Sequence, residues 1–223
     1  MTPSFFSQAS AITRRDLMRE RRSGEVLWVT LPFGAVALLL IPIAIGVDTP
    51  TLKDVGVGMF WVVIMLFGVL VAVRRTTTAN QAERDMVALT GLDPAASYVG
   101  SALANFVLLL AYEVVLGALT VVLYDIEMTG FVWFPLILIL VAAGLALLGT
   151  LAGAIVAGGT GTSALVPFIV APLSVPLLIA ATQSFEGLRL GHSILTWVLM
   201  LVVIVLVLAI AGVLTARPLQ ETS

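Results

Sequence analysis

Long apolar runs separated by short polar breaks constrain this chain more than any other feature. Each of six runs approaches or exceeds the roughly 20 residues that a helix needs to cross a membrane. Of the 223 residues, 60% are hydrophobic and only 11% are charged, which together with such runs is typical of integral membrane proteins. We therefore expect an all-α, multi-pass membrane protein that forms a single domain over residues 1–223. The six spans are predicted at residues 26–47, 55–73, 99–123, 131–157, 164–182 and 194–216.

The positions of the basic residues predict the orientation of these spans. With the N-terminus in the cytoplasm, only Lys53 and Arg189 fall in the outer loops. Cytoplasmic loops carry the excess of lysine and arginine in membrane proteins, so we expect both the N-terminus and the C-terminus on that side. The basic residues of the cytoplasmic segments are then Arg14, Arg15, Arg19, Arg21, Arg22, Arg74, Arg75, Arg84 and Arg217.

The segment before the first span, residues 1–25, is polar and basic and carries a loose apolar stripe. This pattern favours an interfacial helix whose arginines face anionic lipid headgroups. A solvated basic tail is the alternative, and the sequence does not separate the two. The residues of the stripe are Phe5, Phe6, Ala9, Ile12 and Leu17.

The longest polar interruption, residues 74–100, separates the second and third predicted spans. Thr78 and Gln81 have the spacing of a capping box, which starts a helix, and Gly91 followed by Pro94 is typical of a helix end. We predict a short amphipathic helix at about residues 79–91, on the cytoplasmic surface, that docks onto a separate soluble protein. The candidate docking residues are Gln81, Glu83, Arg84, Met86, Leu89 and Leu92.

Residues suited to chemistry are scarce. The chain has no cysteine and one histidine, His192, so thiolate catalysis and a multi-histidine metal site are excluded. The glycine-rich segment 158–163 lacks the lysine of a phosphate-binding loop. His192 is expected in an outer loop, where it is a solvated side chain, a helix cap or an axial ligand. We expect no catalytic residue, no metal and no stably bound cofactor, so a partner must supply any energy.

Glu113 lies within the third predicted span, where a carboxylate costs on the order of a few kcal/mol. It either lines a path or couples to gating, or it makes a packing hydrogen bond to a neighbour. The neighbours considered are Tyr112, Thr120 and Asn105.

Three prolines in the fifth span and a ridge of small residues in the fourth concern helix packing. Pro167, Pro172 and Pro176 each remove a backbone donor, so this span should be packed inside protein, either as a static kink or as a broken helix that moves during gating. The small residues Gly149, Gly153 and Ala157 recur at intervals of four and allow close helix approach.

Four stretches of the chain resemble the CcmB family, permeases of cytochrome c maturation within the type-2 ABC exporter group. They are RRDLMRERRSGE before the first span, GMFWVVIMLFGVL in the second, QAERDMVALTGLDPAASYVGSALANF after it, and PFIVAPLSVPLLIAATQSF in the fifth. The fifth-span match is the most specific. Val87 and Ser101 depart from the family pattern, which usually has a small residue and a lysine there.

The resemblance implies a type-2 ABC exporter permease in the bacterial inner membrane, present in two copies and driven by a cytoplasmic ATPase of the CcmA kind that grips the 79–91 helix. Haem is the implied cargo, or a haem-loaded chaperone is released at the expense of ATP. Other implied partners are CcmC-like, CcmD-like and CcmE-like proteins and membrane lipid, with no nucleic acid. A permease for another amphiphile, such as a drug, lipid or glycan, and a non-transporting assembly factor remain as alternatives.

Overall fold

The computed structural model describes the chain except for residues 1–3, 47–48, 79–92, 127–131, 159–163 and 222–223. All regular structure in these described residues is helical. The helices are α1 (Phe5–Ser23), α2 (Leu31–Ile45), α3 (Thr49–Thr78), α5 (Pro94–Tyr124), α6 (Trp133–Gly158), α7 (Leu165–Leu190) and α8 (Leu195–Glu221), and a π-helical stretch at Glu25–Thr30 leads into α2.

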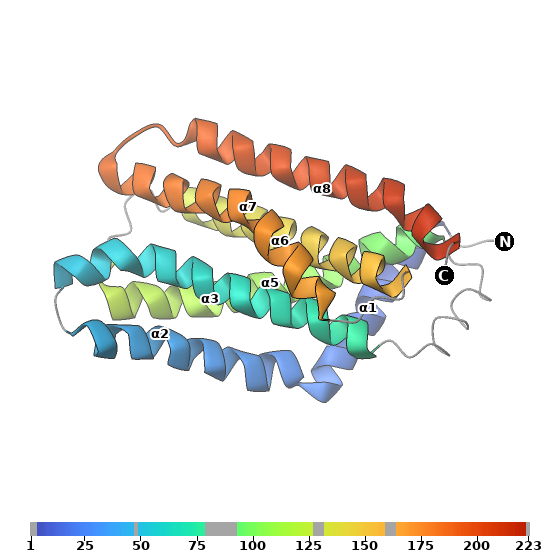
Figure 1. The fold of residues 1–223 in the computed structure, drawn as a ribbon, viewed down its shortest axis with the longest axis horizontal. Coiled ribbons are helices and arrows are strands. Elements are labelled where there is room, and N and C mark those ends of the chain that lie inside the picture. The colour runs from blue at the N-terminus through green and yellow to red at the C-terminus, as the bar shows by residue number, and fades with distance from the viewer. Residues whose placement is uncertain (1–3, 47–48, 79–92, 127–131, 159–163, 222–223) are drawn as a thin grey trace.

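Helices α2, α3, α5, α6, α7 and α8, six of the helices described, run back and forth along one common direction, and α1 crosses them at one end of the bundle (Figure 1). Five of the six, α3, α5, α6, α7 and α8, are long and apolar enough to cross a membrane. The sixth crossing exists only if Phe5–Ser23 and Trp28–Ala44, which are bent by 48° relative to each other, are counted as one span. Five of the expected spans therefore have a matching helix, and the first remains a prediction.

The ends of α3 and α5 differ from the expected span boundaries for local reasons. α5 begins at Pro94 rather than at residue 99, because the Asp93 side chain accepts a hydrogen bond from Ala95 N and proline suits the first helical position. α3 continues to Thr78. Thr78 was expected to cap a separate helix, and this is corrected: it is the last residue of α3, while Gln81 lies outside the described residues.

The fifth predicted span also ends later in the structure. α7 runs through the polar residues after Thr182 and stops at Leu190, where Gly191 takes the left-handed conformation, with φ 68°, and closes the helix. Glu186 and Arg189, expected in an outer loop, therefore lie on the last turns of α7. Lys53 likewise lies in the first turns of α3 rather than in a loop.

The main core joins buried apolar side chains from α2, α3, α5, α6, α7 and α8. Between helices in a membrane, packing and hydrogen bonds replace most of the hydrophobic driving force. Accordingly, tyrosines of α5 donate hydrogen bonds to backbone carbonyls of its neighbours: Tyr124 to Leu38 at 3.0 Å and Tyr98 to Leu147 at 3.1 Å. These bonds fix α5 against α2 and α6, so α5 is the central element of the bundle.

Candidate functional site

The first candidate site is the contact between α1 and the first turns of α5, which we call the α1–α5 junction. It consists of Gln8, Ala9, Ile12, Thr13 and Asp16 on one side and of Asp93, Gly100 and Ser101 on the other. α1 begins at the Ser4 cap, which accepts a hydrogen bond from Ser7 N, and ends at Gly24 with φ 63°. Its only fully buried residues are Ala9 and Ile12.

Three hydrogen bonds join the two helices at this junction. The Thr13 hydroxyl donates to Gly100 O at 2.9 Å, and Asp93 N donates to the Gln8 side-chain oxygen at 3.0 Å. The Ser101 hydroxyl donates to Asp16 at 3.2 Å. Each bond is worth on the order of 1 kcal/mol, so together they hold α1 in one place on α5.

Gly100 lets the two helices approach closely. A Cβ at this position would lie 2.7 Å from Ala9 O and 2.9 Å from the Ile12 Cβ. The first of these atoms belongs to the backbone and cannot move without displacing α1. The glycine in the family-like stretch of residues 81–106 is thus explained by the contact that it makes with α1.

The junction decides between the two interpretations of the N-terminal segment. The solvated basic tail is wrong, because residues 5–23 form a helix that packs on α5. Ala9 and Ile12 of the apolar stripe face protein, whereas Phe6 remains 83% exposed. The arginines of α1 point outward and are exposed: Arg14, Arg15, Arg19, Arg21 and Arg22.

The predicted docking helix at residues 79–91 falls outside the described residues, and so do its candidate residues Gln81, Glu83, Arg84, Met86, Leu89 and Leu92. Its two flanks are described. Thr78 ends α3, and Asp93 caps the start of α5 and donates from its backbone nitrogen to Gln8 of α1. Asp93, the first described residue after the predicted docking helix, is therefore tied to both α1 and α5.

Glu113 is the second candidate site. Its side chain is fully buried in the middle of α5, and neither carboxylate oxygen has a hydrogen-bond partner among the described residues. The expected packing hydrogen bond is wrong, because each proposed neighbour is engaged elsewhere. Tyr112 donates to Thr30 O, Thr120 donates to Leu116 O, and Asn105 donates to the Thr150 hydroxyl.

The core around Glu113 is apolar and aromatic. One turn further along α5, a Cβ at Gly117 would be in ordinary contact with Phe60 and Phe134, 3.6 to 3.7 Å away. Trp61, also buried, has a ring nitrogen without a partner among the described residues. A buried polar group without a partner costs about 1–3 kcal/mol, so Glu113 is retained at a cost in stability.

The prolines of the fifth span lie on a continuous helix. Pro167 falls in the first turn of α7, where no backbone donor is needed. Contrary to the expectation, it therefore does not strain the helix. Pro172 and Pro176 lie inside α7 but are exposed on this chain. The expectation that this face is packed inside the protein is therefore wrong for the single chain. Whether α7 moves during gating stays a prediction.

The predicted small-residue ridge lies on α6. Gly149 is buried and Gly153 is half-buried, while the side chain of Ala157 lies outside the described part of the chain. A close approach that the sequence did not reveal occurs earlier on α6. There, a Cβ at Gly144 would lie 2.7 Å from Leu177 of α7.

His192 lies in the short connection between α7 and α8 and is exposed. In the described part of the chain, no group of three or more histidine, cysteine, aspartate or glutamate side chains is placed to hold a metal ion. Its assignment as a solvated loop residue or as a haem ligand therefore stays open.

Sequence reasoning missed the α1–α5 junction, and some of its signals were present. Asp93 followed by Pro94 is a helix-start pattern, and Gly100 with Ser101 places two small residues one turn inside that helix. The pairing with Gln8, Thr13 and Asp16 had no signal, because it joins residues 85 to 87 positions apart.

Comparison with known proteins agrees with the architecture. A family model described as "CcmB protein" matches residues 7–220. The chain is 26% identical over 175 residues to a protein named "Heme exporter protein B" from Rhodobacter capsulatus, which covers 78% of this chain and 80% of that protein. The match includes α1 and all the long apolar helices, so this multi-pass membrane protein belongs to the CcmB family.

Proposed function

We propose that the chain is the membrane permease subunit of an ABC transporter that serves haem export or delivery for c-type cytochrome biogenesis. The observation that carries this proposal is the family match over residues 7–220, together with a relative named as a heme exporter protein. Neither the other-amphiphile permease nor the non-transporting assembly factor has a comparable observation in its favour. The permease itself is not an enzyme, and ATP hydrolysis belongs to a separate subunit.

The α1–α5 junction gives this function a physical route. A CcmA-like ATPase on the cytoplasmic side presses on residues 79–91. Movement of these residues displaces Asp93, the first described residue after them. Because Asp93 is hydrogen-bonded to Gln8 and caps α5, both α1 and α5 move with it. Because α5 is hydrogen-bonded to both α2 and α6, a displacement of α5 also moves these two helices.

The remaining partners complete an assembly in the bacterial inner membrane, with both ends of the chain in the cytoplasm. We propose two copies of this permease, two ATPase subunits, a CcmC-like haem-handling subunit, a small CcmD-like subunit and a CcmE-like haem chaperone. Haem is cargo here and not a resident cofactor. Either haem crosses with the permease, or ATP turnover releases the haem-loaded chaperone.

Co-purification tests the docking assignment. The full chain and its candidate ATPase are expressed together, and complex yield and ATP turnover are compared between wild type and a Glu83→Ala, Arg84→Ala variant. We expect complex formation to fall by about tenfold, since the loss of one or two charge-assisted contacts corresponds to roughly that factor. Thr196→Ala, exposed at the other end of the bundle, is the matched control. Unchanged yield and turnover in the double variant would show that this segment is not the docking site.

Haem-specific function needs a separate readout. In a strain lacking its own permease gene, wild type should restore covalently haem-stained c-type cytochromes. A functional complex with an ATPase that restores no cytochrome maturation would favour the other-amphiphile permease. The absence of any ATPase partner would favour the assembly factor.

A further inference from the structure

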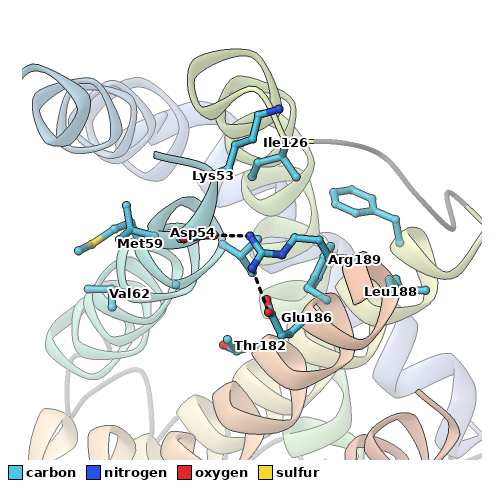
Figure 2. Close-up of a pocket in the computed structure, with 14 residues that line it drawn as sticks. Lys53, Asp54, Met59, Val62, Ile126, Thr182, Glu186, Leu188 and Arg189 are labelled. Carbon is cyan, nitrogen blue, oxygen red and sulfur yellow. Dashed lines mark hydrogen bonds and ion pairs between the residues drawn. The ribbon is translucent and has the colours of Figure 1, made fainter. Parts of the chain in front are cut away.

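A pocket of about 380 Å³ lies between the first turns of α3 and the last turns of α7 (Figure 2), at the end of the bundle opposite the α1–α5 junction. This volume lies within the range of roughly 300–1,000 Å³ that is common for ligand sites. The pocket takes no part in the route from the ATPase described above. Both helices that form it are long and apolar enough to span a membrane, so it opens near one membrane surface.

The rim of the pocket carries charges of both signs. Arg189 of α7 reaches between Asp54 of α3, at 2.6 Å, and Glu186, at 3.0 Å (Figure 2). Lys53 pairs with Asp125 at 3.0 Å. The side chain of Arg189 is 40% exposed and that of Asp54 is 66% exposed. Such exposed pairs contribute little to stability, so their groups can exchange partners with a ligand at small cost.

The walls below this rim are mostly apolar. Val57 and Val62 of α3 and Phe185 of α7 line the pocket, and Phe134 of α6 lies beside Phe185, with ring centroids 5.3 Å apart. At Gly58 an added Cβ would meet no atom within 4 Å, so the helix backbone borders open space there. An apolar chain can therefore lie against these walls beneath the charged rim.

We propose that this pocket holds a zwitterionic phospholipid whose headgroup carries a primary ammonium. The ammonium donates to the carboxylates of Asp54 and Glu186, and the phosphate accepts from Arg189 and Lys53. The upper part of an acyl chain fills the space beside Gly58. A purely anionic amphiphile fits less well, because among the described residues of the rim the carboxylates of Asp54, Glu186 and Asp125, the partner of Lys53, outnumber the cations Arg189 and Lys53. A neutral apolar molecule would gain nothing from the rim.

Native mass spectrometry of the full chain tests this proposal, with phosphatidylethanolamine, phosphatidylcholine and phosphatidylglycerol of identical acyl chains. We expect phosphatidylethanolamine to be retained about tenfold more than either of the others, because only it satisfies both signs of charge with hydrogen-bond donors. Water-soluble glycerophosphoethanolamine distinguishes a lipid from a free headgroup, and it should compete poorly.

Gly58→Leu is the decisive variant, because it adds a side chain at the pocket wall at a position where an added Cβ meets no atom within 4 Å. It should reduce phosphatidylethanolamine retention about tenfold with an unchanged helical circular dichroism spectrum. Ala118→Leu, exposed on α5 outside the pocket, is the matched control and should bind as wild type. Asp54→Asn combined with Glu186→Gln should remove the preference over phosphatidylcholine.

Three results with the lipid probes would overturn the proposal. The first is equal lipid retention in Gly58→Leu and Ala118→Leu. The second is retention of phosphatidylglycerol or phosphatidylcholine as strong as that of phosphatidylethanolamine. The third is displacement of the lipid by glycerophosphoethanolamine at equal concentration. Displacement by haem, one molecule for one, would also overturn it and would make the pocket a cargo site. None of these measurements needs the ATPase, so their outcome is independent of the proposed transport function.

Discussion

At the start of α5, polar groups of two helices are paired across the α1–α5 junction, whereas halfway along the same helix a carboxylate is buried with no partner in the described residues. The two regions differ in packing as well. Gly100 is pressed against the backbone of α1, while Gly117, near Glu113, faces aromatic rings at ordinary contact distance.

This difference indicates two kinds of role. The junction is organised for stability, because its hydrogen bonds and close packing join groups of both helices. Glu113 instead lowers the stability of the fold, since an isolated carboxylate inside a membrane bundle is costly. Such a residue is by default a functional candidate. Residues that lower the stability of the fold in this way are expected at functional sites.

The largest expected effect comes from Glu113→Leu. Replacing this carboxylate, which has no hydrogen-bond partner in the described part of the chain, by an apolar side chain of similar size should raise the free energy of unfolding by about 3 kcal/mol. Thermal unfolding in detergent, followed by circular dichroism, measures this change. If Glu113 takes part in gating, cytochrome maturation falls in the same variant although the protein is more stable. A destabilised Glu113→Leu protein would show that the carboxylate has a partner in the membrane. It would then no longer differ from the α1–α5 junction, where polar groups are paired.

Gly100→Ala compared with Gly117→Ala is the sharpest matched pair. At Gly100 the new Cβ meets Ala9 O, so we expect a loss of about 2 kcal/mol and release of α1. At Gly117 the same change meets only ordinary contacts and should be neutral. Limited trypsin digestion at the α1 arginines reports release of α1. Equal protease resistance in the two variants would contradict the tight packing at the junction.

Gln8→Ala removes the side-chain oxygen that accepts from Asp93 N. We expect a loss of about 1 kcal/mol and faster cleavage within α1. If the proposed route is correct, stimulation of ATP turnover by the permease also weakens. Ser7→Ala, exposed on α1, serves as the control. If α1 is cleaved faster but the permease still stimulates ATP turnover normally, the junction has a purely structural role.

Ser101→Lys should have the smallest effect. It introduces a lysine, the residue type that the resemblance in the sequence led us to expect here, and places a cation beside Asp16, which Ser101 contacts in the structure. We expect a gain of about 0.5 kcal/mol that disappears at high salt, as for other partly exposed ion pairs. Unfolding curves at two salt concentrations measure it. A gain that is insensitive to salt would mean that the lysine acts by packing and not by charge.

Much of the fold follows from local pattern in this sequence. The apolar runs predicted the five long helices that can cross a membrane, and the proline-rich stretch marked α7. Helix ends were less well predicted. α7 continued through polar residues to Leu190, and α5 started early at Pro94, because caps and turn glycines set these limits more than hydropathy does. That Glu113 lies within a span was visible from its position, but its lack of a hydrogen-bond partner among the described residues was not.

The sequence by itself determined that this chain is a multi-pass helical protein of the CcmB family, because hydrophobic run length and family-like stretches are properties of the chain read in order. Only the tertiary structure decided that α1 is held on Gly100, that Glu113 has its neighbours engaged elsewhere, and that Arg189 joins Asp54 above a pocket. The physical reason is distance along the chain. These contacts join residues far apart in sequence, and side-chain partners at such separations are chosen by how whole helices pack.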